Sequence, residues 1–278
     1  MNTPIPAPRP TSSRVRRAAT VLGLITCVAG LAGGATAAGA ASGTATAKAA
    51  AGRSAALHDQ LRAVFAASDE AKLKRNPILA LVRGDLRYAD QFGDYISDAY
   101  LDAERRAAEQ DLAALKRIDR AALGAVDQIS YDVFRYTRDL DRRGYAPSLL
   151  AATKVRPIDH FSGLQTEMPQ LSSGESLAPF GNVADYDNNL KRLDGYVKYM
   201  DAAIGRMREG LASGVTQPKL VVRNMIEQFD NLLAEGVEGS TFYKPVLKFP
   251  EAVPAAERER LAVAYARFIR ERLALYYD

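Results

Sequence analysis

The chain has 278 residues, of which 47% are hydrophobic, so it is long enough for one large domain or two small ones. Residues 1–49 hold five basic and no acidic side chains, which leaves a formal charge of −1 for the rest of the chain. This distribution excludes the basic surface typical of nucleic-acid-binding proteins, and the single cysteine, Cys27, excludes structural disulfides and thiolate metal sites.

The N-terminal residues 1–49 have the order of a secretory signal peptide and a small-residue spacer. Arg14, Arg16 and Arg17 form a positive segment, residues 18–31 are apolar, and several Ala-x-Ala sites follow. We predict that about 40 residues are removed on export, which places the protein in the periplasm or outside the cell without a membrane span. An uncleaved anchor and a lipid anchor at Cys27 are the alternatives that we favour less.

Residues 50–278 follow helical spacing, and strand-like alternation is scarce, so we predict one all-α domain. We expect the first helix to run from Ser54 to just before Asn76-Pro77, because a proline disfavours helix in the residue preceding it. Further helices are expected from Pro77 to Gly84, from Asp98 onward, and from Gly124 to Gly144. The side chains expected to be buried are Leu57, Leu61, Val64 and Phe65; Leu101, Ala108, Leu112 and Leu115; and Ile129, Val133, Tyr136 and Leu140.

Between Gly144 and Asp185 the helical pattern is interrupted by four prolines and three glycines. Apart from a possible helical turn over residues 148–152, we interpret this segment as a long connection. Connections of this length inside a compact domain tend to be functional or disordered. We favour an ordered segment because it carries large apolar side chains, namely Phe161, Leu164, Met168, Leu171 and Phe180.

The segment from Asp185 to Leu233 predicts an antiparallel hairpin of two long helices. Asp185 can cap the first helix, Gly210 and Gly214 supply its stop, and Pro218 suits the start of the second. Apolar residues spaced alternately by three and four positions predict the buried faces: Leu190, Leu193, Val197, Met200, Ile204, Met207 and Leu211, then Val221, Met225, Phe229 and Leu232. Such a stripe most often reflects packing alone.

A second irregular stretch, residues 236–254, precedes a last helix that begins at Ala255. This helix has no Gly, Asn or Pro to end it, and its apolar stripe still continues at Leu275. We therefore expect the chain to be truncated inside a helix, with the apolar face of that helix left uncovered.

Few side chains suit catalysis. The motifs HExxH, G-x-S-x-G and the P-loop are absent, and only two histidines occur. His58 is expected on a helix surface. His160 lies in Asp159-His160-Phe161-Ser162-Gly163, where a neighbouring acid and a glycine suit a site that orients an imidazole. A loop histidine that binds backbone groups is the plainer interpretation. We predict no catalytic residue, no metal ligand and no cofactor in this chain.

Several motifs together resemble the N-terminal half of the bacterial DUF885 family. The most specific is the Arg-Glu-Gly…Gly-Val-Thr-Gln-Pro stretch within residues 207–218. The others are Asn76-Pro77 with Gly84–Tyr88, Asp127–Asp132, the Asp159–Gln165 loop, and Asp185-Tyr186 leading into Arg192-Leu193. The resemblance covers residues 57–277, essentially all of the mature chain.

This resemblance implies a secreted or lipid-anchored, mostly helical protein with the architecture of zinc-dependent peptidases. The family's HExxH motif lies in a C-terminal half that this sequence does not contain, so zinc is expected only for a full-length parent. The chain would then form one wall of a peptide-binding cleft, and the missing catalytic half would be its partner. Asp159, His160, Gly163 and Gln165 are the residues we predict on that wall. An independent helical binding module of the cell envelope is the alternative.

Overall fold

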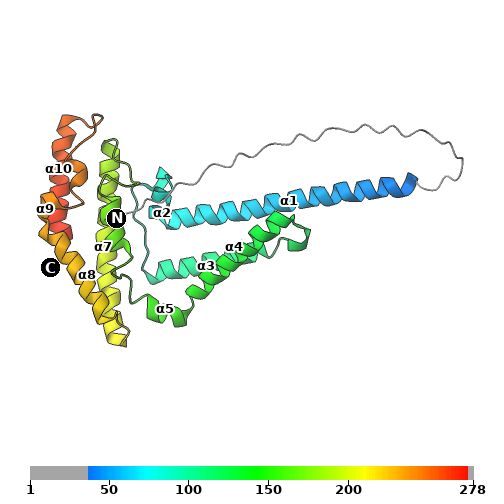
Figure 1. The fold of residues 1–278 in the computed structure, drawn as a ribbon, viewed down its shortest axis with the longest axis horizontal. Helices are drawn as coiled ribbons and strands as arrows, with labels where there is room; N and C mark the ends of the chain where they lie inside the picture. Colours follow the sequence, from blue (N-terminus) through cyan, green and yellow to red (C-terminus); the bar gives the residue numbers. More distant parts are fainter. Residues whose placement is uncertain (1–36, 275–278) are drawn as a thin grey trace, which may run out of the picture. The chain divides into compact units, whose positions relative to one another are not determined.

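The computed structural model describes residues 37–274, and every regular element in that range is helical, which confirms the all-α class. Contacts within the chain divide the protein into two compact units, Met1–Ala47 and Lys48–Asp278. The packing described in this section is that of the second unit. The predicted signal peptide falls largely on residues 1–36, outside the described residues. The helices are α1 (Ala37–Arg75), α2 (Pro77–Val82), α3 (Asp98–Leu115), α4 (Ala125–Gly144), α5 (Pro147–Thr153), α6 (Leu164–Leu171), α7 (Val183–Ser213), α8 (Lys219–Ala234), α9 (Gly236–Gly239) and α10 (Ala255–Phe268) (Figure 1).

The first helix, α1, ends at Arg75, directly before Asn76-Pro77 as predicted, but it begins at Ala37 rather than Ser54. The added residues are mostly alanine, which has the lowest intrinsic cost in a helix, so the helix extends into the segment interpreted as a spacer. Pro77 then opens α2, and Gly84 follows it with a φ of +80°, a left-handed conformation that glycine adopts readily.

The longest helix of the second unit, α7, begins with a capping box. The Asn182 side chain accepts the Asp185 backbone N–H at 3.2 Å, and the Asp185 carboxylate accepts the Asn182 N–H at 3.1 Å. Asp185 is therefore the third helical residue and not the cap, which corrects the predicted start. Gly214, with a φ of +76°, ends the helix in the left-handed conformation as predicted.

Helix α7 supplies the centre of the main hydrophobic core. Leu193, Val197 and Met200 are buried as predicted, whereas Leu211 at the end of the stripe is exposed. The core also includes buried side chains from the chain segments on either side of α7: Ile78, Leu81, Phe92, Ile96, Ile158, Met168, Met225, Phe242 and Leu273. Residues 158–171 are thus ordered, as expected, because Met168 and Leu171 are buried in this core.

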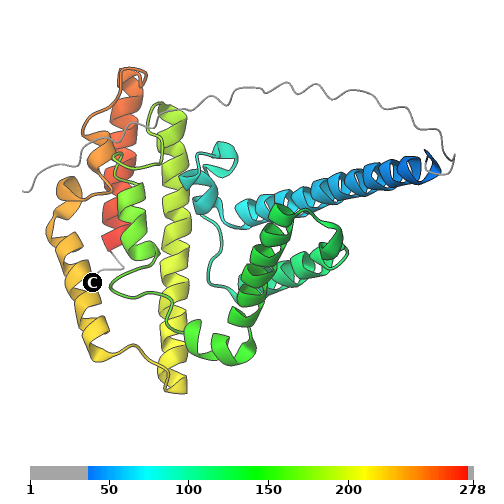
Figure 2. The same cartoon turned by 45° about the vertical axis from the view of Figure 1, so that its right-hand side comes forward.

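Helices α7 and α8 form the predicted antiparallel hairpin, with one difference. They separate as they leave the connection at residues 214–218, and Figure 2 shows α6 lying between them. Sequence analysis did not predict α6, because Pro169 lies inside this short helix. The connection is held by Gln217, whose side-chain amide donates to the Ile158 carbonyl at 2.8 Å. Part of the Gly144–Asp185 segment, α6, therefore lies between the two helices of the hairpin.

A second core joins α1, α3 and α4. It contains Leu61, Leu115, Ile118, Leu123 and Tyr131. The face of α4 that enters this core carries Tyr131 and Phe134. The stripe that we predicted to be buried, Ile129, Val133, Tyr136 and Leu140, is exposed instead. Apolar periodicity identified an amphipathic helix correctly, but the opposite face, with Tyr131 and Phe134, is the one that enters the core.

The last helix, α10, packs against the first half of α7. Leu261 and Tyr265 are almost completely buried, and the Tyr265 hydroxyl donates to the Tyr186 carbonyl at 3.1 Å. The expectation that the final helix leaves its apolar face uncovered is therefore wrong for the described residues. Within residues 37–274, no helix is both long enough and apolar enough to cross a membrane.

Candidate functional site

The Asp159–Gln165 loop closes on itself through the side chain of Asp159. The Asp159 carboxylate accepts the backbone N–H groups of Phe161 at 2.7 Å and Ser162 at 2.9 Å, and the Ser162 hydroxyl at 3.2 Å. The backbone N–H groups of Ser162 and Phe161 lower the pKa of Asp159, because they stabilise its ionised form. The carboxylate is engaged by its own loop rather than by the neighbouring imidazole.

Gln165 and Gly163 complete the loop. Gln165 is 2% exposed, and its amide donates to the Asp159 carbonyl at 2.5 Å and the Ser162 carbonyl at 3.2 Å. Gly163 has a φ of +126° and a ψ of 165°, a conformation that is essentially restricted to glycine. A Cβ atom on Gly163 would lie 2.3 Å from Gln165 Oε1. Three of the four predicted residues thus form one interlocked unit.

Gly163→Ala is expected to destabilise the protein by about 1–3 kcal/mol, because the backbone conformation is strained for any residue with a Cβ. The displaced Gln165 amide would also lose its hydrogen bonds to the backbone carbonyls of Asp159 and Ser162. Urea unfolding monitored by circular dichroism measures the loss. Gly144→Ala is the matched control, since a Cβ there meets no atom within 4 Å, and its stability should change by less than about 1 kcal/mol.

His160 packs against a neighbouring ring, and its Nδ1 atom makes no hydrogen bond to Asp159. Its ring lies against that of Phe161, with centroids 4.1 Å apart, and its backbone carbonyl accepts the Gln228 side-chain amide at 2.8 Å. Among the described residues, the buried His160 Nδ1 and Gln165 Oε1 have no hydrogen-bond partner. Phe161 is 86% exposed, which corrects the expectation that it is buried. The Gln228 side chain on α8 therefore holds the loop by its backbone, and the loop presents an aromatic side chain to solvent.

A groove of about 290 Å³ lies beside this loop, between α6 and α8. Six of its ten lining residues carry an amide or a hydroxyl: Gln165, Thr166, Gln170, Gln228, Asn231 and Thr241. Glu235 is the one charged lining residue, so the groove is polar but nearly neutral. Of the four predicted residues, Gln165 lines this groove, whereas Asp159, His160 and Gly163 shape the loop at its edge.

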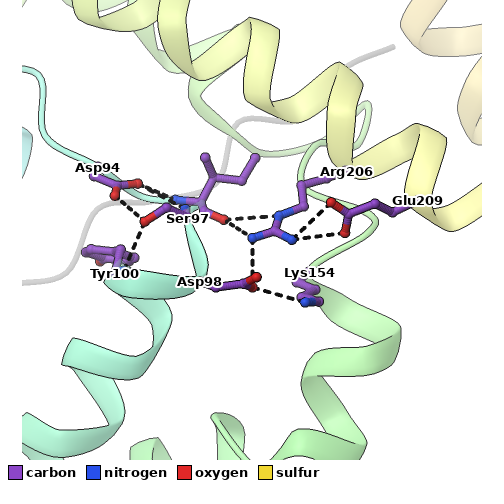
Figure 3. Close-up of polar contacts among 8 residues, drawn as sticks. Asp94, Ser97, Asp98, Tyr100, Lys154, Arg206 and Glu209 are labelled. Atoms are coloured by element: carbon purple, nitrogen blue, oxygen red, sulfur yellow. Dashed lines mark hydrogen bonds and ion pairs between the residues drawn. The ribbon is translucent and has the colours of Figure 1, made fainter.

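Two buried arginines of α7 were missed by sequence analysis. Arg206 donates to the Ile96 carbonyl at 3.0 Å, to Asp98 at 2.8 Å and to Glu209 at 2.9 Å, and Lys154 adds a contact of 3.0 Å to Asp98 (Figure 3). Hydrogen bonds from Lys154 and Arg206 lower the pKa of Asp98. This cluster joins α7 to the start of α3 and the end of α5.

The second arginine, Arg192, is 1% exposed and has no carboxylate partner at hydrogen-bonding distance among residues 37–274. It donates to the Ala89 carbonyl and, at 3.0 Å, to the Asn189 side chain, which in turn donates to the Tyr265 hydroxyl at 3.1 Å. Burial lowers the pKa of Arg192 to about 10. In the sequence, the two arginines stand directly before Leu193 and Met207 of the predicted apolar stripe.

The described residues do not fit a catalytic zinc ion, which needs three protein ligands that converge on one point. His58 Nδ1 lies 3.0 Å from the Asp127 carboxylate on α4, whereas His160 belongs to the loop beside α8. The exposed position of His58 agrees with the sequence prediction. Within residues 37–274, no three His, Cys, Asp or Glu side chains are grouped so that they could hold a metal ion.

The fold and this site define a class: an all-α protein with a polar groove and without a zinc ligand set in its described part. The chain belongs to the DUF885 family, described as a bacterial protein of unknown function, whose model matches residues 77–278. This confirms the family of the resemblance found in the sequence, over residues 77–278. No curated protein matches.

A solved structure with a similar fold is that of a candidate lipoprotein from Colwellia psychrerythraea. The two structures have a TM-score of 0.61 and 12% sequence identity over 80% of this chain. The present chain spans only 40% of the length of that protein. At this level of identity the comparison establishes a shared fold.

Proposed function

We propose that this chain is the non-catalytic N-terminal half of an exported DUF885-family protein that resembles zinc-dependent peptidases. In this proposal the groove between α6 and α8, together with the Asp159–Gln165 loop, forms one wall of a cleft for a peptide. The observation that carries the proposal is the set of neutral amide and hydroxyl side chains that line the groove. The lipoprotein description of the structural neighbour supports an envelope location.

Neutral hydrogen-bonding side chains suit a peptide because each peptide unit offers one N–H donor and one C=O acceptor. An amide side chain supplies both a donor and an acceptor, so Gln170, Gln228 and Asn231 can pair with a main chain whatever its sequence. Phe161, exposed at the edge of the same loop, offers an apolar contact for a side chain. The wall would therefore position a substrate, while hydrolysis would depend on residues from another part of a full-length protein.

Peptide binding by the purified chain tests the proposal, with labelled unstructured peptides and fluorescence anisotropy. Gln170→Leu removes an exposed amide of the groove and is expected to weaken binding about 5–10-fold, the worth of about one hydrogen bond. Gln60→Leu, which removes an exposed amide from α1, is the matched control and should bind as the wild type does. Equal affinities for all three proteins, or no binding at all, would contradict the assignment of the groove.

The non-catalytic role predicts that the isolated chain holds no stoichiometric zinc and does not cleave peptides, because two separated histidines cannot supply three ligands. Metal analysis after gel filtration and a cleavage assay on the same fractions measure both properties. One tightly held zinc ion per chain, or zinc-dependent turnover, would overturn the proposal. An open reading frame that continues past codon 278 and encodes HExxH would distinguish this role from an independent binding module.

A further inference from the structure

One face of α4 carries an uninterrupted row of exposed apolar side chains. Val126 is 76% exposed and Ile129 is 65% exposed, and the row continues through Val133, Tyr136 and Leu140. The five residues, which we call the α4 seam, are spaced by three, four, three and four positions. This is the heptad spacing by which one helix packs along another. Scattered exposed apolar residues are ordinary, but a continuous row of this kind marks an interaction surface.

The opposite face of α4 is already occupied. Tyr131 is buried in the core shared with α1 and α3, and the ring of Phe134 lies 4.7 Å from that of Phe65 on α1. Figures 1 and 2 both show α4 alongside α3. Because that face holds α4 in place, a partner can cover the α4 seam without rearrangement of the fold. Within the described residues, no segment of the chain buries the seam.

The polar side chains next to the seam already have partners within the same chain. Ser130 donates its hydroxyl to the Val126 carbonyl at 3.1 Å, and Thr137 donates to the Val133 carbonyl at 3.1 Å. Asp132 and Asp139 flank the other side, and each is paired with an arginine, Asp132 with Arg120 and Asp139 with Arg142. Covering the seam would therefore leave few of these groups without a hydrogen-bond partner, which keeps the cost of removing them from water small.

The charge of α4 indicates which partner fits. Residues 125–134 contain two aspartates and no basic side chain, and so carry −2. Residues 135–144 contain four arginines and two aspartates, and so carry +2. A second α4 in the antiparallel direction places the acidic half of each helix beside the basic half of the other, whereas a parallel copy places like charges together. Antiparallel helix dipoles also attract.

We propose that the α4 seam is a self-association surface, on which a second copy of this chain binds through its own α4 in the antiparallel direction. The contact is isologous: the same residues serve on both copies around a two-fold axis close to Val133. In this arrangement Val126 of one copy lies next to Leu140 of the other. The interface goes beyond the proposed peptide groove, which lies on different helices.

Sedimentation velocity of the full chain over a range of concentrations tests the proposal. The wild type is expected to show a reversible monomer–dimer equilibrium. The double variant Ile129→Gln/Val133→Gln should raise the dimer dissociation constant at least 10-fold, while its circular dichroism is unchanged because both side chains are already exposed. Val263→Gln, at a 62% exposed valine on α10, is the matched control and should leave the equilibrium unchanged.

Disulfide cross-linking reports the direction of the helices in a Cys27→Ser background. The pair Val126→Cys/Leu140→Cys should form an intermolecular disulfide on mild oxidation, and Val126→Cys alone should not. A monomer at every concentration overturns the proposal, as does a dimer that survives the double substitution in the seam. Cross-linking of Val126→Cys alone would overturn the antiparallel arrangement.

Discussion

Met200→Asp is expected to unfold most of the protein, whereas Lys198→Asp leaves it folded. Met200 is 4% exposed in the core around α7, so an aspartate there loses water without gaining a partner. A buried charge without compensation costs about 3–5 kcal/mol, a large part of the about 5–15 kcal/mol that stabilises an ordinary domain. Lys198 lies two residues away on the exposed face of the same helix, and its substitution should cost less than about 1 kcal/mol.

Urea unfolding of both variants, followed by far-UV circular dichroism, measures the two losses. The pH dependence gives a second check. Burial raises the pKa of the new carboxyl in the folded state above its unfolded value, so the folded state binds more protons as the pH falls. The destabilisation by Met200→Asp should therefore shrink in acid. Equal losses for the two variants at neutral pH would mean that the buried face of α7 is assigned wrongly.

Helix boundaries were the most predictable part of the fold, because proline and glycine act on the backbone locally. Pro77 starts α2, α4 runs from just after Gly124 to Gly144, and Gly214 ends α7. These signals do not depend on what packs against the helix. The start of α1 at Ala37 was not predicted. A run of alanine and glycine carries no apolar stripe by which a helix could be recognised in the sequence.

Which face of a helix is buried was less predictable. The heptad row of α4 is a stronger periodic signal than Tyr131 and Phe134, yet the aromatic face is the one that enters the core. Spacing reports that a helix is amphipathic, but the partner that covers each face is decided by the tertiary fold. The row at Ile129 and Val133 therefore lies on the surface, although its sequence pattern is the same as that of a buried helix face.

The candidate site was predictable in part for the same physical reasons. Asp159 and Gln165 belong to one loop closed by local hydrogen bonds, and Gly163 supplies its positive φ, features that short-range sequence patterns can suggest. The groove itself needs Gln228 and Asn231 from α8, more than 60 residues away in the sequence. No local pattern brings these segments together. The burial of Arg192 and Arg206 was missed because each also donates to a backbone carbonyl about 100 residues away in the sequence, Ala89 and Ile96, and no local pattern reports such a contact.

Two glycines of α7 are expected to respond in opposite directions to the same substitution. A Cβ on Gly205 meets no atom within 4 Å, so Gly205→Ala should stabilise the protein by about 0.5–1 kcal/mol, the gain of alanine over glycine inside a helix. A Cβ on Gly195 would lie 2.3 Å from the Phe92 Cβ atom, which is closer than real contacts allow. Sequence alone cannot separate the two positions, since both are glycines inside a helical pattern.

Phe92 cannot easily move to accommodate the new methyl group. It is 3% exposed, and its ring contacts those of Tyr95, Tyr196 and Tyr199 at centroid distances of 5.5, 6.0 and 5.9 Å. Overpacking of such a site costs about 1–3 kcal/mol, which exceeds the gain in helix propensity, so Gly195→Ala should destabilise the protein. Thermal unfolding of both variants measures the difference. A stabilising Gly195→Ala would show that α7 and the Phe92 segment are not in close contact, and that the core around α7 is more loosely packed than described.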